Sequence, residues 1–209
     1  MKFSPQQIDA LRYKVKRALS EKRYVHSLGV EKCAIRLSKY CLPGFEDELA
    51  VAALLHDITK EFSKVEQLSI LAANNVSLTE YEIKSEQILH SYTAPFVISG
   101  EYAEYATRNI LSSVRNHTVG DENMSIFDEI IFLADFIEDG REYRSSIAIR
   151  EYVNEQMREN DTENNMLVLH NAALRSINFT ILHLLEKNRH IIEKTVLTRN
   201  ALLSKMLHI

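Results

Sequence analysis

Polar residues that could carry chemistry stand at the ends of, or inside, strongly apolar segments of this sequence. They are His26, His56, Asp57, His90, His117 and Asp135. His56 and Asp57 directly follow six apolar residues in "AVAALLHDITKEF", and Asp135 lies within "IIFLADFI". A buried polar group costs free energy unless it finds a partner, and a buried charge costs more. An ionised Asp135 therefore needs a cation, a set of hydrogen-bond donors or a raised pKa.

A divalent metal ion would satisfy these groups together. Imidazole nitrogens and carboxylate oxygens are suitable ligands for iron, manganese or zinc. Neighbouring side chains on a helix diverge by about 100°, so His56 and Asp57 can share an ion only if it lies beside the helix at their level. We expect His26 and Asp135 to complete the site from other helices. Each histidine alone is more often a helix cap or a surface group; the ordered set is what indicates a metal site.

Five sequence blocks resemble the bacterial YqeK family, within the HD-domain superfamily of metal-dependent phosphohydrolases. In chain order they are "RYVHSLGV", "AALLHDITK", "ILHSY", "NHTVG" and "IIFLADFIEDGR". The resemblance is strong over about residues 20–145 and looser over the C-terminal third. One departure is Glu138-Asp139-Gly140, because many relatives have a proline after this glutamate.

The resemblance implies a symmetrical dinucleoside tetraphosphate hydrolase that cleaves diadenosine tetraphosphate (Ap4A) into two ADP. It also implies bound iron as one or two ions, with manganese or zinc as alternatives. A metal ion lowers the pKa of bound water from about 15.7 toward 7, so metal-bound hydroxide can attack a phosphoryl group. Alternatives are another HD-domain phosphohydrolase, acting on nucleotides, ppGpp or cyclic dinucleotides, and a nucleotide-binding HD module without catalysis.

Asp57, His90 and His117 are the predicted catalytic residues, and two roles stay open for the histidines. They can hold a second metal ion that Asp57 bridges to the first. Alternatively, they bind phosphate oxygens and donate a proton to departing ADP. Neutral imidazole suits the first role and imidazolium the second, and the sequence does not choose between them.

A tetraphosphate needs local cations, because the protein is acidic overall with a formal charge of −4. Arg23 precedes His26 by three residues and Lys60 follows His56 by four, so each shares a helix face with a predicted ligand. Arg141 comes shortly after Asp135 and could bind phosphate through two parallel hydrogen bonds. We predict these three as phosphate-binding residues, although most single basic side chains are solvated surface groups.

The C-terminal segment "EKTVLTRNALL" resembles a family block that reaches the nucleotide. Thr195, Arg199 and Asn200 are therefore candidate substrate contacts, and an ordinary terminal helix is an equally good interpretation. The remaining histidines of this region lack a surrounding pattern, and we interpret them as structural or surface residues. They are His170, His183 and His190.

The predicted fold is all-α: an HD-domain bundle of many short helices around a metal site. Only 5 glycines and 3 prolines occur in 209 residues, which favours helices over short strands. Helix start signals and apolar spacing predict these segments: 5–20, 23–41, 46–58, 63–75, a helix from residue 79 into "EQILH", 101–116, 125–138, and two or three helices in 144–209. Pro95 and Gly100 are predicted to mark joints. We expect one domain, 1–209, with its metal core in about 20–145 and residues 146–209 closing a nucleotide pocket.

Composition limits the partners and the compartment. The acidic balance argues against broad nucleic-acid binding, and the sequence lacks an apolar stretch near 18 residues and a signal-peptide core at its start, so no membrane association is expected. Cys33 and Cys41 share one predicted helix at about 12 Å, too far for a disulfide. Reduced thiols favour the cytoplasm. The resemblance also makes a homodimer plausible.

Overall fold

The structure is a computed structural model that describes residues 2–207, and these residues form α-helices and one short 3₁₀ helix, with no strand among them. The order is α1 (Pro5–Ala18), α2 (Glu21–Cys41), α3 (Glu46–Leu55), α4 (Lys64–Ala73), α5 (Glu80–Lys84), α6 (Glu86–Glu101), η1 (Ala103–Tyr105), α7 (Arg108–Asn116), α8 (Ile126–Ile137), α9 (Arg144–Gln156), α10 (Thr162–Glu186) and α11 (Glu193–Leu207). The all-α prediction is confirmed.

The predicted helix starts are real capping boxes. Ser4, Ser63, Thr79 and Ser125 each accept a hydrogen bond from the backbone three residues later, and the side chain of that residue returns a bond to the cap. Such reciprocal bonds satisfy two backbone donors that a helix start otherwise leaves free. Local sequence therefore sets these boundaries.

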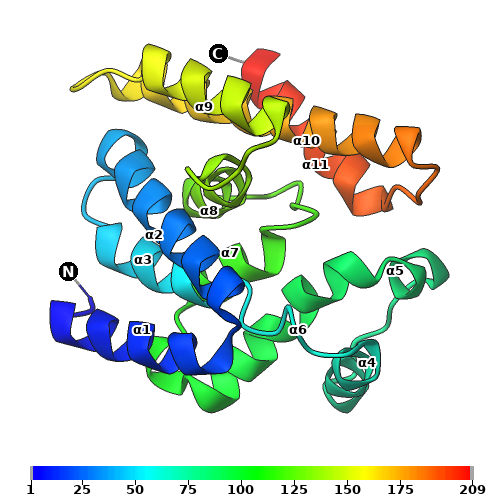
Figure 1. Cartoon of the computed structure of the whole chain (residues 1–209). Helices are drawn as coiled ribbons and strands as arrows, with labels where there is room; N and C mark the ends of the chain where they lie inside the picture. Colours follow the sequence, from blue (N-terminus) through cyan, green and yellow to red (C-terminus); the bar gives the residue numbers. More distant parts are fainter. Residues whose placement is uncertain (1, 208–209) are drawn as a thin grey trace.

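Five helices, each packed against at least one of the others, build the centre of the molecule. Helix α2 packs against α3 and α8, while α7 packs against α3, α6 and α8. Helices α9, α10 and α11 form a layer on the other side of α8 (Figure 1). Each of the five central helices carries, or is followed directly by, one of the histidines or aspartates predicted to bind metal. The packing of this core thus decides whether those side chains meet.

The predicted helix that starts at Thr79 is interrupted, and the predicted joint at Pro95 is wrong. The chain breaks at the buried Ser85 into α5 and α6. Pro95 lies inside α6, although a proline removes one backbone bond of the preceding turn. One residue before the carbonyl that Pro95 leaves without its helical donor, the carbonyl of His90 accepts hydrogen bonds from the Thr59 and Thr93 hydroxyls, at 3.0 and 3.2 Å.

Two other predicted helices are shorter in the structure. The 101–116 segment contains η1 and then α7, whose start is capped by Thr107. Helix α3 ends at Leu55 with His56 as its cap, so Asp57 lies in the following turn. His56 keeps helical backbone angles (φ −56°, ψ −38°), and its Nε2 nevertheless lies 3.5 Å from Asp57 Oδ2, so the two side chains face one point.

The two cysteines form no disulfide, as the sequence-based analysis predicted. Cys33 and Cys41 are both free and buried. Burial raises the pKa of the Cys33 thiol to about 11 and that of Cys41 to about 12, so both are poor nucleophiles. Within residues 2–207, no helix combines the length and apolar character needed to cross a bilayer.

A buried ion cluster ties α11 and α10 to α8. Glu129 is completely buried; His170 lies 2.7 Å and Lys205 2.5 Å from its two carboxylate oxygens. Lys205 also donates to the carbonyl of Met124 at 2.9 Å. The prediction that His170 is structural is confirmed, and His190 is exposed beside the Tyr81 ring.

Candidate metal centre

The structure brings all six predicted residues together, although their positions in the chain span more than 100 residues. Three overlapping groups have ligand atoms within 4.8 Å of one another: His26–His56–Asp57, His56–His117–Asp135 and Asp57–His90–His117. The imidazoles form a continuous row, with neighbouring ring centroids separated by 5.3, 5.0 and 4.9 Å. This arrangement is a compact cluster of nitrogen and oxygen donors.

Three of the histidines have their tautomer fixed by an acceptor behind the ring. His56 Nδ1 lies 2.6 Å from the Ala53 carbonyl, and His117 Nδ1 lies 2.7 Å from the Val114 carbonyl. His26 Nδ1 faces Glu138 Oε1 at 3.2 Å. These oxygens can only accept, so in the neutral form of each ring Nδ1–H donates and Nε2 carries the lone pair that faces the centre. Metal-binding histidines are held in this way.

The donor set fits a divalent metal ion. His26 Nε2 and His56 Nε2 are buried and have no hydrogen-bond partner among residues 2–207, which is costly for polar atoms. His26 Nε2 lies 2.9 Å from Asp135 Oδ1, but without hydrogen-bond geometry. Burial lowers the pKa of His26, and the carboxylates of Asp135 and Glu138 outweigh it and raise that pKa to about 9. A metal ion that binds His26 Nε2 would therefore displace the proton that this imidazole otherwise carries at neutral pH.

Asp57 joins the two halves of the cluster. Its Oδ2 lies 3.5 Å from His56 Nε2 and 3.8 Å from His26 Nε2. Its Oδ1 lies 3.1 Å from His90 Nε2 and 3.7 Å from His117 Nε2. Burial raises the pKa of Asp57, but the histidines around it outweigh burial and hold it well below its usual range. The carboxylate is ionised at neutral pH and can face two positions at once.

His90 and His117 are neutral at physiological pH. Both are buried; burial lowers the pKa of His90 to about 3 and also lowers that of His117. Their Nε2 atoms lie 2.9 Å apart, within hydrogen-bond distance. Lys60 Nζ lies 3.3 Å from His90 Nδ1, and burial lowers the Lys60 pKa. Neutral imidazoles are metal ligands or acceptors rather than ready acids.

The predicted phosphate-binding cations lie at the rim of the cluster, where each approaches an aspartate or histidine. Arg23 Nη1 is 2.6 Å from Asp57 Oδ2, and Arg141 Nη2 is 2.5 Å from Asp135 Oδ1. Lys60 Nζ is 4.0 Å from Asp57 Oδ1. About 30% of each of these side chains is exposed, so their outer faces remain accessible to an anion.

Glu138 is a residue that the sequence-based prediction missed. Its carboxylate contacts His26 and accepts a hydrogen bond from the Gly140 backbone N–H at 2.6 Å. Gly29 lies directly against it, and a Cβ at that position would overlap Glu138 Oε2. The glycine one turn after His26 therefore makes room for the carboxylate that orients this histidine. The quoted blocks contain both residues, but their contact appears only in three dimensions.

Replacing Glu138 by glutamine is expected to weaken metal binding about 10- to 100-fold, the usual cost of losing a carboxylate behind a ligating histidine. The glutamine keeps the size of the side chain but removes the charge that fixes the His26 tautomer. Competition with a chelating dye measures the dissociation constant. Asp139→Asn is the matched control, since this neighbouring carboxylate is about half exposed and faces Lys32. Equal metal affinity for Glu138→Gln and the original protein would contradict the assignment.

The C-terminal candidates do not join the cluster through any polar contact within residues 2–207. Thr195 is buried in the packing of α11, and Arg199 donates to Asn178 of α10 and to Asn200, both at 3.1 Å. Their role in substrate binding stays a prediction. Thr198 of the same helix contacts the loop after His117, where it donates to the Val119 carbonyl at 3.1 Å.

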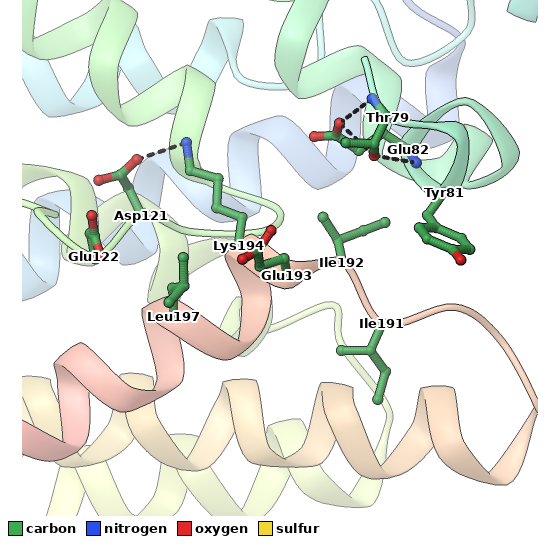
Figure 2. A pocket seen from close by; sticks show the side chains of 10 residues that line it. All are labelled: Thr79, Tyr81, Glu82, Asp121, Glu122, Ile191, Ile192, Glu193, Lys194 and Leu197. Carbon is green, nitrogen blue, oxygen red and sulfur yellow. Dashed lines mark hydrogen bonds and ion pairs between the residues drawn. The ribbon is translucent and has the colours of Figure 1, made fainter.

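Helix α11 also lines a hollow that contains no cluster residue. Figure 2 shows it between the Thr79–Glu82 turn and residues 191–197, with the Asp121–Lys194 ion pair on one side. This pair, at 2.7 Å, is a second link between α11 and the loop that follows His117. The hollow is thus a neighbour of the metal centre rather than the centre itself.

The all-helical fold and the buried histidine–aspartate cluster at its centre are those of a metal-binding helical protein. The chain belongs to the HD domain family, whose sequence pattern matches residues 23–139. It is similar to the "Bis(5'-nucleosyl)-tetraphosphatase, symmetrical" of Halalkalibacterium halodurans, with 33% identity over 90% of this chain and 93% of that protein. The Bacillus subtilis protein of the same name is 30% identical over 91% and 94%.

A solved structure shows the same fold. An HD superfamily hydrolase from Clostridium acetobutylicum, described as involved in NAD metabolism, superposes with a TM-score of 0.81 at 27% identity. The similarity covers 94% of this chain and 97% of that one. The resemblance to HD-domain phosphohydrolases inferred from the sequence is therefore confirmed.

Proposed function

We propose that this protein hydrolyses Ap4A symmetrically to two molecules of ADP. The histidine–aspartate cluster carries this proposal, because it supplies the ligands that a metal-dependent phosphohydrolase needs in a chain aligned over nine-tenths of its length with symmetrical tetraphosphatases. Water adds its oxygen to one of the two central phosphorus atoms. The bond from that phosphorus to the central bridging oxygen breaks, and one ADP leaves with this oxygen while the other carries the new one.

We propose His26, His56, Asp57 and Asp135 as ligands of one ion, and Asp57, His90 and His117 as ligands of a second. A bound divalent ion would supply an activated water and draw charge from the phosphoryl oxygens. The neutral state of His90 and His117 favours the second-ion role over proton donation to ADP.

Two ions per chain are expected by elemental analysis, and about one in a His90→Ala/His117→Ala variant.

The residues around the ions bind and orient the substrate in this proposal. Arg23, Lys60 and Arg141 hold phosphate oxygens, since their accessible faces surround the cluster. Departing ADP is protonated by solvent water at the rim, because the buried imidazoles are neutral. Helices α9 to α11 cover one side of α8 and close the nucleotide pocket, with Thr195, Arg199 and Asn200 as candidate contacts.

Ap4A is expected to be converted to ADP alone, without AMP or ATP, and the activity is expected to fall below about 1% after chelation. Adding back Fe²⁺, Mn²⁺ or Zn²⁺ in separate assays tests which ion restores it. Chromatographic separation of the products measures both results. A metal-stripped protein that retains full activity would contradict the metal-dependent mechanism.

The other HD-domain reactions differ from this one in the substrate that is cleaved. A panel of Ap4A, ppGpp, deoxynucleoside triphosphates and cyclic di-AMP distinguishes them in one assay. Cleavage of another member with Ap4A left intact would overturn the substrate proposal, while the metal centre would stand. A metal-loaded protein that binds ADP and cleaves none of the panel would support a non-catalytic nucleotide-binding module.

We further propose iron as the ion in the cell, on the basis of the sequence resemblance, and the cytoplasm as its location, which the free buried cysteines support. The acidic composition supports a small nucleotide rather than a nucleic acid as the ligand. The homodimer stays a prediction. Light scattering of the purified protein tests it.

A further inference from the structure

A pocket of about 320 Å³ opens beside the metal centre, between the end of α8, the start of α9 and the second half of α10. Its inner wall contains Asp135 and Arg141. Its outer wall is formed by residues of α10, chiefly Phe179, Thr180 and His183. Ligand pockets usually measure about 300–1,000 Å³, so this one suits a small planar group.

Aromatic rings line much of this pocket, and two of them are exposed. Phe136 comes from α8, Tyr143 from the turn before α9 and Phe179 from α10. Tyr143 is 72% exposed and Phe179 42% exposed. Contiguous exposed apolar surface with polar residues at its rim is typical of ligand-binding grooves and other interaction sites. The faces of such rings are suited to stacking on a heterocyclic base.

The pocket also offers polar groups that could contact the edge of a base. The Thr180 hydroxyl donates to the Ser176 carbonyl at 3.0 Å, which leaves its lone pairs available to accept. The His183 ring makes no hydrogen bond with any of residues 2–207. A few polar groups in an aromatic pocket are the usual means of orienting a small ligand. His183, interpreted from the sequence as a structural or surface residue, is exposed on this side of α10.

A cationic pocket of about 680 Å³ continues from the aromatic one. Arg141 and Tyr143 line both; the second also contains Lys22, Arg23 and His26, and its basic side chains outnumber its two carboxylates, Glu138 and Glu142. The metal cluster therefore contributes Asp135 to one pocket and His26 to the other. An aromatic hollow, a cluster of metal ligands and a cationic hollow lie in continuous contact. A dinucleoside polyphosphate has groups in a matching order: a base with its ribose, the central phosphates that react, and the remaining phosphates.

We propose that the pocket formed by Phe136, Tyr143, Phe179, Thr180 and His183 binds one nucleobase of the substrate. The proposal rests on the proposed function, because it takes the substrate to be a dinucleoside polyphosphate. Tyr143 and Phe179 supply the stacking surfaces, and Arg141 marks the passage from the base to the phosphates. The pocket thereby determines affinity for the nucleoside, while the metal ligands act on the phosphates.

Calorimetric titration of the metal-loaded protein with ADP and with pyrophosphate tests this proposal. Phe179→Ala and Tyr143→Ala are each expected to weaken ADP binding about 10-fold, in line with the loss of one stacked base. Pyrophosphate binding is expected to stay within about 2-fold. Phe179→Tyr, which keeps an aromatic face, should restore most of the ADP affinity. Leu182→Ala is the control, because Leu182 is exposed on the same helix outside the pocket.

Two outcomes would overturn the proposal: unchanged ADP affinity in both alanine variants, or an equal loss of ADP and pyrophosphate binding. Hydrolysis assays separate this result from the proposed function. If the original protein cleaves Ap4A and the alanine variants keep its KM, the pocket assignment is wrong and the function stands. If ADP binding depends on Phe179 but Ap4A is not cleaved, the pocket stands and the function is wrong.

Discussion

Asp57→Asn is expected to lower kcat/KM for Ap4A by about 1,000-fold, or about 4 kcal/mol of transition-state stabilisation. The reason is the position of the carboxylate between the two halves of the cluster, with Oδ2 toward His26 and His56 and Oδ1 toward His90 and His117. An amide of the same shape carries no charge, so it binds an ion weakly and cannot bridge two. Steady-state kinetics with elemental analysis of the same sample measures both effects.

Asp9→Asn is the matched control, since it removes the same charge from an exposed position on α1. It is expected to leave activity and metal content unchanged. Far-UV circular dichroism checks that the Asp57→Asn protein keeps its helices. If this variant retained the metal and more than a tenth of the activity, the cluster would not be the site of the reaction.

The ligands of the centre were predictable because their types are unusual where they stand. An aspartate within "IIFLADFI" and a histidine–aspartate pair after six apolar residues both contradict the hydrophobic pattern around them. Each such departure costs free energy unless a partner compensates for it. The capping boxes were predictable for a different reason: their bonds join residues three apart, so the whole motif is local.

Contacts between segments that are distant in the chain could not be predicted from the sequence in the same way. Glu138 orients His26 across 112 residues, and Gly29 matters only because that carboxylate lies against it. Helix α6 continues through Pro95, and the hydroxyl of Thr59, on a different segment, contacts it at the His90 carbonyl. The turn at Ser85 and the Thr107 cap lack the strong local signal of a capping box. In each case tertiary contacts, rather than local propensity, decide the structure.

Glu129→Ala is expected to lower the free energy of unfolding by about 3–5 kcal/mol, because it leaves His170 and Lys205 without their shared buried carboxylate. For a chain of this size each kcal/mol corresponds to about 2–4 °C in melting temperature, so a decrease of about 6–20 °C follows. The unfolding measurement should be made on metal-free protein, because bound metal would stabilise the folded state further. Thermal unfolding followed by circular dichroism gives the shift.

Lys205→Met measures the contribution of the Glu129–Lys205 ion pair apart from that of the Glu129–His170 pair. It removes the partner that is about one-third exposed and keeps the buried Glu129–His170 contact, so a loss of only about 1 kcal/mol is expected. Glu129 lies on α8 six residues before Asp135, and the cluster joins α10 and α11 to that helix. The Glu129→Ala protein should therefore keep its metal affinity at low temperature and lose it together with the fold on heating. Loss of metal affinity while the helices stay intact would show that Glu129 acts on the centre directly.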